Sequence, residues 1–149
     1  MATQDELKRI AAEKAVEFVP ENEYIGIGTG STINFFIEAL GKSGKKIKGA
    51  VSTSKKSSEL LAKYEIPEVS LNDVMGLAVY VDGADEVNHA LQMIKGGGGA
   101  HLNEKIVASA SDKFVCIADE SKYVSRLGKF PLPVEVVENA RSLVSRKLL

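Results

Sequence analysis

This sequence of 149 residues has few of the features that mark secreted, membrane or nucleic-acid-binding proteins. Its single cysteine, Cys116, cannot form an intramolecular disulfide, which indicates a reducing compartment. The 19 basic and 20 acidic residues nearly balance, so no nucleic-acid partner is expected. No apolar run is long enough to cross a bilayer, and residues 1–18 are charged and amphipathic rather than signal-like. We therefore expect a cytoplasmic protein with no membrane partner.

Histidine is scarce too, and the two that occur, His89 and His101, are not spaced as a metal-binding pair. No cluster of cysteine and histidine accompanies them, so we expect no metal site. No plausible Ser-His-Asp pattern is present either, which leaves a hydrolytic triad with little support.

Short apolar segments alternate with segments of helical period. The predicted strands are Tyr24–Ile27, Ile47–Val51, Leu77–Val81 and Phe114–Ala118. The first predicted helix begins at a capping box formed by Thr3 and Glu6. The other predicted helices cover roughly residues 32–40 (ended by Gly41), 54–64 and 102–110. The strands lack polar alternation, as is typical of parallel strands buried on both faces. The pattern predicts an α/β fold, a mostly parallel sheet flanked by helices in a Rossmann-like three-layer arrangement.

The character of the chain changes after Pro133. Residues 1–133 are predicted to form the α/β domain. Val134–Val137 is a candidate strand, and Ala140, Leu143, Val144 and Leu148 form a helical stripe. Residues 134–149 are therefore predicted to be the first strand and helix of a second, small α+β domain.

Glycines and hydroxyls follow the first predicted strand, in the segment Gly28-Thr29-Gly30-Ser31-Thr32. Backbone N–H groups at the start of the following helix can hold a phosphate, and three hydroxyl residues exceed what a tight, capped turn needs. The dinucleotide fingerprint G-x-G-x-x-G fails, because Ser31 occupies its last position. Gly41-Lys42-Ser43 imitates the end of a Walker A loop, but Phe36 replaces the required glycine.

Two aspartates, Asp82 and Asp85, come directly after the third predicted strand. Paired carboxylates in a cleft can have separated pKa values, so that one donates a proton while the other accepts. An Asx-type turn, in which both carboxylates only bond the backbone, explains the pair equally well.

Lys95 precedes four consecutive glycines, Gly96 to Gly99. Such a run costs chain entropy and indicates positive φ angles or close approach of backbone to a ligand, for example as an oxyanion hole. Glu104 lies in the first turn of the next predicted helix and points back towards the glycines. A helix-capping role for Glu104 and a surface role for Lys122 are the ordinary explanations of those two residues.

Several of these motifs, in this order and spacing, resemble the type A ribose-5-phosphate isomerases. The matching segments are Gly28-Thr29-Gly30-Ser31-Thr32, Val81-Asp82-Gly83-Ala84-Asp85-Glu86, Lys95-Gly96-Gly97-Gly98, Glu104-Lys105-Ile106 and Gly128-Lys129-Phe130-Pro131-Leu132-Pro133-Val134-Glu135-Val136. The resemblance extends from the first helix to the last residues, but family members continue beyond the position of Leu149.

The resemblance implies interconversion of ribose 5-phosphate and ribulose 5-phosphate in the pentose phosphate pathway, by a homodimer that needs no cofactor. It implies that Glu104 is the base and that Asp82 and Asp85 assist ring opening and proton traffic. Substrate binding and charge stabilisation fall to Thr29, Gly30, Ser31, Thr32, Gly83, Ala84, Lys95, Gly96, Gly97, Gly98 and Lys122. A sugar-phosphate-binding module without catalysis and an inactive fragment of a longer isomerase are the alternatives.

Overall fold

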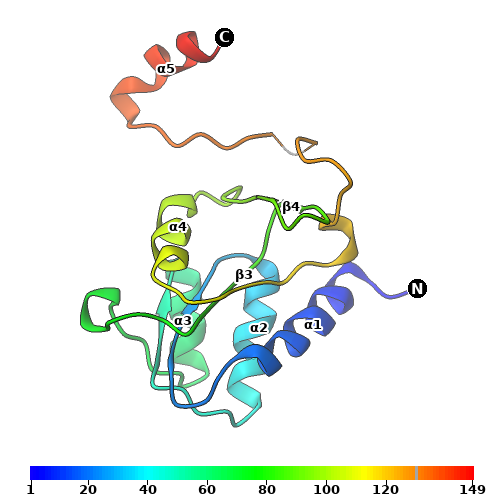
Figure 1. Ribbon diagram of the computed structural model, residues 1–149, viewed down its shortest axis with the longest axis vertical. Helices are drawn as coiled ribbons and strands as arrows, with labels where there is room; N and C mark the ends of the chain where they lie inside the picture. Colours follow the sequence, from blue (N-terminus) through cyan, green and yellow to red (C-terminus); the bar gives the residue numbers. More distant parts are fainter. Residues whose placement is uncertain (130) are drawn as a thin grey trace.

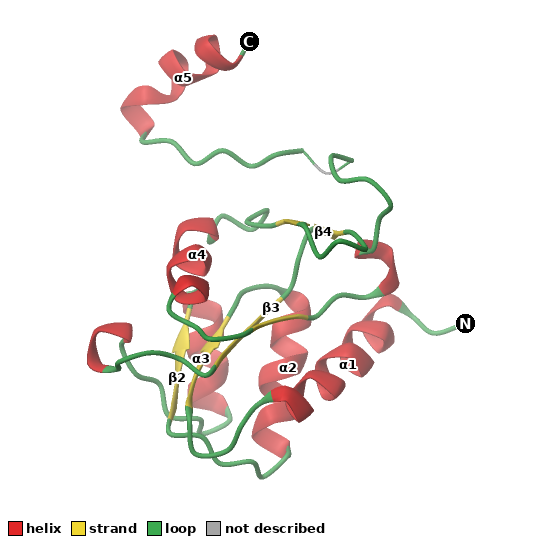
Figure 2. Cartoon of the chain, in the orientation of Figure 1, coloured by secondary structure: helices red, strands yellow, loops and turns green. Residues whose placement is uncertain are grey.

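The computed structural model describes residues 1–129 and 131–149, and Phe130 of the quoted motif lies outside the described residues. The helices and strands follow one another along the chain as Figures 1 and 2 show: α1 (Gln4–Ala15), β1 (Tyr24–Ile27), α2 (Ser31–Lys42), β2 (Gly49–Ser52), α3 (Lys55–Lys63), β3 (Val79–Asp82), β4 (Glu86–Val87), β5 (Met93–Ile94), α4 (His101–Ser109), β6 (Phe114–Cys116) and α5 (Arg141–Leu148).

The main sheet has four strands in the order β2-β1-β3-β6, and all three pairings are parallel. Strands β2 and β3 lie on opposite sides of β1, so the strand order changes direction there. In open parallel sheets, ligands bind beside the carboxyl ends of the strands at such a switch point. The predicted parallel α/β arrangement is confirmed.

Consecutive residues of the central strands face opposite sides of the sheet. Val79 and Val81 of β3 pack into the cluster that α1, α2 and α3 share, while Tyr80 between them packs with Val107 of α4. Three helices thus cover one face and α4 covers the other, as Figure 2 shows. This is the predicted arrangement of three layers.

Gly26 of β1 lets α4 approach the sheet closely. A Cβ atom at this position would lie 2.6 Å from Val107 Cγ1 and 2.9 Å from the Tyr80 ring. Real Cβ atoms essentially never come so close to other heavy atoms. The missing side chain therefore fixes the height of α4 above β1, and with it the position of Glu104 one turn earlier.

The predicted helices exist, but one of the predicted ends is wrong. Thr3 caps α1 through the expected capping box with Glu6. Helix α2 continues through Gly41 to Lys42, and Gly44, with φ of +72°, follows its last turn instead. Gly41 is glycine for a packing reason, because a Cβ there would lie 2.7 Å from the Cβ of Tyr64.

The predicted strand at Val134–Val137 is also wrong, because residues 131–137 have no regular structure. Its apolar side chains find no partner strand, and Val137 is 75% exposed. Leu143, Val144 and Leu148 of the predicted helical stripe lie in α5, and Ala140 ends the 3-10 turn before it (Glu138–Ala140). Helix α5 stands away from the body of the molecule in Figure 1. Among the described residues, no helix has both the length and the apolar character needed to cross a bilayer.

Candidate active site

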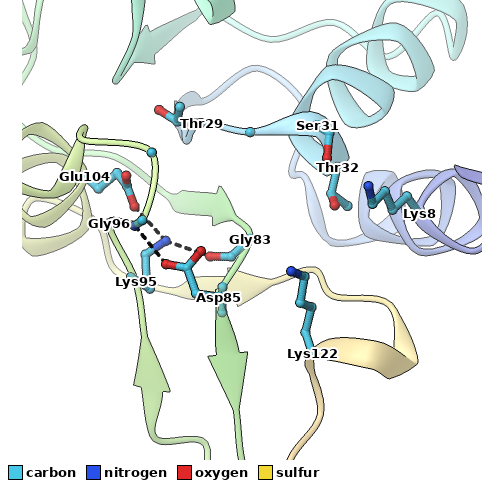
Figure 3. A pocket seen from close by; sticks show the side chains of 14 residues that line it. Lys8, Thr29, Ser31, Thr32, Gly83, Asp85, Lys95, Gly96, Glu104 and Lys122 are labelled. Carbon is cyan, nitrogen blue, oxygen red and sulfur yellow. Dashed lines mark hydrogen bonds and ion pairs between the residues drawn. The ribbon is translucent and has the colours of Figure 1, made fainter. Parts of the chain in front are cut away.

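A cleft of about 160 Å³ lies at the carboxyl ends of β1 and β3, at the switch point of the sheet. Figure 3 shows its two ends: carboxylates and Lys95 lie on one side, and hydroxyls with two further lysines lie on the other. The residues that line it are Lys8, Thr29, Gly30, Ser31, Thr32, Gly83, Ala84, Asp85, Lys95, Gly96, Gly97, Gly98, Glu104 and Lys122. The structure therefore brings all the predicted site residues but one to a single cleft.

Glu104 reaches this cleft from the first turn of α4, as predicted, and is only 5% exposed. Its Oε1 atom lies 2.8 Å from Nζ of Lys95. Burial raises the pKa of the Glu104 carboxyl, and the negative charge of Asp82 raises it further, which together outweigh the opposing effect of Lys95. A carboxylate with a raised pKa is a stronger base than an ordinary glutamate, which suits it to accept a proton from a substrate.

Lys95 uses all three of its N–H donors on neighbouring oxygens. Besides the pair with Glu104, Nζ donates to Asp82 Oδ2 at 2.7 Å and to the carbonyl oxygen of Gly83 at 2.6 Å. Burial lowers the pKa of Lys95, but the two carboxylates outweigh burial, and the pKa lies above its ordinary value. The lysine is therefore a fixed cation at the carboxylate end of the cleft.

Asp82 is the predicted site residue that does not line the cleft, because its side chain is 0% exposed and lies behind Lys95. Its Oδ1 accepts from the backbone N–H groups of Thr29 and Gly83. Its Oδ2 accepts from Lys95 and from the hydroxyl of Tyr80. The buried carboxylate thus joins the turn after β1 to the lysine, and the role in ring opening and proton traffic that the resemblance implies for Asp82 stays a prediction.

Asp85 does reach the cleft and is held by the glycine loop. Its Oδ2 accepts a hydrogen bond from the N–H of Gly97 at 2.8 Å. Gly96 and Gly99 have φ angles of +86° and +85°, which explains why the loop needs glycine at these positions. The N–H of Gly99 donates to the carbonyl of Gly96. Of the four glycine N–H groups, that of Gly97 is therefore used by Asp85 and that of Gly99 within the loop, and the predicted oxyanion hole stays a prediction.

The opposite end of the cleft is built on the first turn of α2. Gly30, with φ of +117°, precedes the helix, and Ser31 and Thr32 begin it. The N–H groups of a first helical turn have no partner within the helix and attract anions. Thr29 is fixed beside them, since its Oγ1 lies 2.8 Å from that of Thr53.

Lys8 and Lys122 bring two positive charges to the same end, as Figure 3 shows. Lys122 ends a short 3-10 turn (Glu120–Lys122) that Asp119 caps by accepting from the N–H of Ser121. Lys8 comes from α1, and its side chain is only 13% exposed. Sequence reasoning missed Lys8, although its spacing to buried Ala12 and Ala15 places it on the inward face of α1. A lysine on the same face of the helix as these buried alanines could therefore have been predicted from the sequence.

The carboxyl end of β2 does not contribute to the lining of the cleft. Ser52 at the end of β2 bonds Ser58 and Glu68, and Thr53 bonds Thr29 and the carbonyl of Ile27. This strand end supports the turn after β1 from behind.

The order of these residues along the chain agrees with comparisons to known proteins. Residues 49–149 match the family described as ribose 5-phosphate isomerase A (phosphoriboisomerase A). The ribose-5-phosphate isomerase A of Neisseria meningitidis serogroup C is 94% identical over all 149 residues. The chain belongs to the ribose 5-phosphate isomerase A family. It spans about two thirds of the length of these relatives, 67% in that case.

Solved structures of isomerase family members have the same fold. The crystal structure of the enzyme from Neisseria gonorrhoeae is 92% identical, with a TM-score of 0.98 over 99% of this chain and 66% of that one. A D-ribose-5-phosphate isomerase in complex with phospho-erythronic acid is 39% identical, with a TM-score of 0.94 over 99% of this chain and 66% of that one.

Across residues 1–129 and 131–149, no group of three or more His, Cys, Asp or Glu side chains is arranged to hold a metal ion. Cys116 is half-buried beside β3, and burial raises the pKa of its thiol, so it is a poor nucleophile.

Proposed function

We propose that this chain carries the active site that interconverts ribose 5-phosphate and ribulose 5-phosphate, a step of the pentose phosphate pathway. The observation that carries the proposal is the buried Glu104–Lys95 pair facing a cleft whose other end presents Lys8 and Lys122. A sugar phosphate has matching ends: a dianionic phosphate, and a carbonyl carbon whose neighbour must lose a proton. Phospho-erythronic acid, which a family member binds, also carries both a phosphate and a carboxylate.

The phosphate would lie at the first turn of α2, between Lys8 and Lys122. Ser31 and Thr32 supply hydroxyl and backbone N–H donors there. Holding the phosphate at this end directs the carbonyl end of the open-chain sugar towards Glu104. Positioning of this kind replaces a bimolecular encounter by an intramolecular one.

Glu104 would remove the proton from C2 of the aldose, and its carboxylate becomes neutral as it does so. The electron pair of the broken C–H bond forms the C1–C2 double bond of an enediolate, and the carbonyl oxygen gains the negative charge. Lys95, released from its neutralised partner, can turn an N–H donor to that oxygen. The proton of the C2 hydroxyl then passes to the C1 oxygen, the electron pair left on the C2 oxygen forms the new carbonyl, and the C1–C2 π pair takes the proton back from Glu104 at C1. The product is the ketose, and atoms and electrons balance without an oxidant.

Asp85 would act at the sugar hydroxyls, where ring opening requires a proton to leave one oxygen and reach another. Its position in the cleft, fixed by the N–H of Gly97, supports this role. The glycine loop and residues 83–84 would line the path of the substrate.

The decisive experiment compares Glu104→Gln with the unchanged chain, in an assay of both reaction directions. We expect turnover to fall by more than about 10³-fold, because the amide cannot accept the proton. Binding of phospho-erythronic acid by calorimetry should stay within a few-fold. Turnover close to that of the unchanged protein would contradict Glu104 as the base.

An inactive fragment is the second candidate, favoured by the length of the relatives. The same assay on this chain and on one extended to the relatives' length distinguishes the two. Activity in both supports a competent active site here, whereas activity in the extended chain alone supports the fragment. Binding without turnover in both would indicate a non-catalytic sugar-phosphate module.

We also propose that residues 134–149 begin a second unit and that the complete protein is a cytoplasmic homodimer. The exposed apolar side chains of this segment support the first point, since Leu143 is 50% and Leu148 is 66% exposed. The single cysteine supports a reducing compartment. Light scattering of the extended chain tests the dimer.

A further inference from the structure

Tyr80 is a fully buried tyrosine whose hydroxyl is fixed in direction. Its side chain is 0% exposed, and its ring packs edge-on against Phe114 with centroids 5.1 Å apart. A buried tyrosine hydroxyl needs a polar partner, and Tyr80 finds it in Asp82, at 2.5 Å from Oδ2. Tyr80 lies beneath α4, beside Val107, and does not line the cleft.

The oxygen that Tyr80 bonds is the one that holds Lys95. Asp82 Oδ2 accepts from Tyr80 and from Nζ of Lys95, which in turn lies 2.8 Å from Glu104. A continuous series of contacts therefore leads from the core to the base: Tyr80, Asp82, Lys95, Glu104. Each member is at least four-fifths covered, so the series lies in a low-dielectric region where each bond matters more than at the surface.

We propose that Tyr80 is a positioning residue, whose hydroxyl holds Asp82 in the orientation that sets Lys95 against Glu104. The proposal rests on the proposed function, in which Glu104 is the base and Lys95 the cation beside it. It assigns a role in the reaction to a core residue that does not touch the cleft.

The charged and titratable groups around this series determine how the pKa of Glu104 changes when the Tyr80 hydroxyl is removed. Asp82 and Glu104 are two carboxylates that share one cation, Lys95, and the neutral thiol of Cys116 lies on β6 beside Asp82. Burial raises the pKa of Tyr80, and so does Asp82, which keeps the hydroxyl protonated as a donor. Without that donor, the charge of Asp82 is less neutralised and acts more strongly on Glu104.

Tyr80→Phe tests the proposal because it removes the hydroxyl and keeps the ring. We expect the pKa of Glu104 to rise by about half a pH unit or more, measured by carboxyl ¹³C NMR titration of the chain. In a form that turns over, kcat should fall about three- to tenfold while KM changes less than twofold, because the phosphate end is untouched. Tyr64→Phe is the control, since Tyr64 packs on the other face of the sheet.

A double-mutant cycle separates positioning from general loss of stability. In an Asp82→Asn background, Tyr80→Phe should add almost nothing to the shift at Glu104, since the charge through which it acts is gone. An unchanged Glu104 titration in Tyr80→Phe, or full additivity with Asp82→Asn, would overturn the proposal. A shift seen in a chain without turnover would support the positioning role while the proposed function fails, because the titration requires no reaction.

Discussion

Nζ of Lys95 lies 2.8 Å from Oε1 of Glu104 and 2.7 Å from Oδ2 of Asp82, so one buried cation holds two carboxylates. The group as a whole carries a single negative charge, and proton uptake by Glu104 neutralises it. In the proposed reaction, the charge that Glu104 loses appears on the substrate oxygen nearby. The site thus keeps its total charge while the proton moves, and little reorganisation is required.

Replacement of Lys95 by methionine should affect both stability and chemistry. The substitution leaves Asp82 and Glu104 close together without their cation, and breaking a buried pair in this way costs about 3–5 kcal/mol. We expect a lower midpoint in urea unfolding and loss of turnover. Lys95→Arg should not restore turnover, because the planar guanidinium cannot replace three divergent N–H donors. An unchanged urea midpoint in Lys95→Met would contradict a stabilising role of the two ion pairs of Lys95.

The raised pKa of Glu104 predicts where activity is lost on acidification. The base must be ionised, so the acid limb of kcat/KM against pH should lie above the ordinary glutamate value of 4.5. The effect of pH on the free energy of unfolding has the opposite sign to that of an ordinary salt-bridged carboxylate, whose pKa is lowered by folding. Because folding favours the protonated form of Glu104, its contribution is complete at low pH and declines as pH rises from 4.5 through the folded pKa.

The measurement is a pH series of kcat/KM together with urea unfolding, on the unchanged chain and on Glu104→Gln. The difference in unfolding free energy between the two proteins should change with pH in this window. An acid limb at or below 4.5 would contradict the burial effect on Glu104.

Much of the sheet could be predicted because buried parallel strands leave a strong signal. The predicted strand Tyr24–Ile27 coincides with β1, and the predicted strand Phe114–Ala118 contains β6, which ends two residues earlier at Cys116. At Val134–Val137 the same apolar pattern predicted a strand that does not form, because a strand also needs a neighbouring strand with which to make hydrogen bonds. Composition cannot show whether that neighbour is present.

The cleft was predictable where its residues follow strand ends, as Asp85 and Lys122 do. Lys8 was not predicted because it belongs to a helix far from the other site residues in sequence, and only tertiary packing brings α1 to the cleft. The burial of Asp82 could not be predicted either. It depends on the space that Gly28 leaves, since a Cβ there would lie 1.9 Å from the carboxyl carbon of Asp82.

That contact predicts a strong effect of Gly28→Ala. The added methyl group would displace the Asp82 carboxylate, which is held by four donors, and through it Lys95. We expect overpacking to cost about 1–3 kcal/mol and turnover to fall at least tenfold. Gly76→Ala is the matched control, because a Cβ there meets only Ala110 O at 3.6 Å. Equal urea midpoints and equal turnover in the two variants would show that Asp82 has room to move.

Lys8 offers a test of the phosphate end that leaves the base untouched. Removing its charge in Lys8→Gln should raise KM for ribose 5-phosphate about five- to tenfold and alter kcat little, since the contact is the same in substrate and transition state. The affinity for phospho-erythronic acid should fall by a similar factor in calorimetry and should become less sensitive to salt. Lys14→Gln is the control on the same helix, where Lys14 is exposed and pairs only with Glu17 among the described residues. If the two variants bind the ligand equally well, Lys8 does not hold the phosphate.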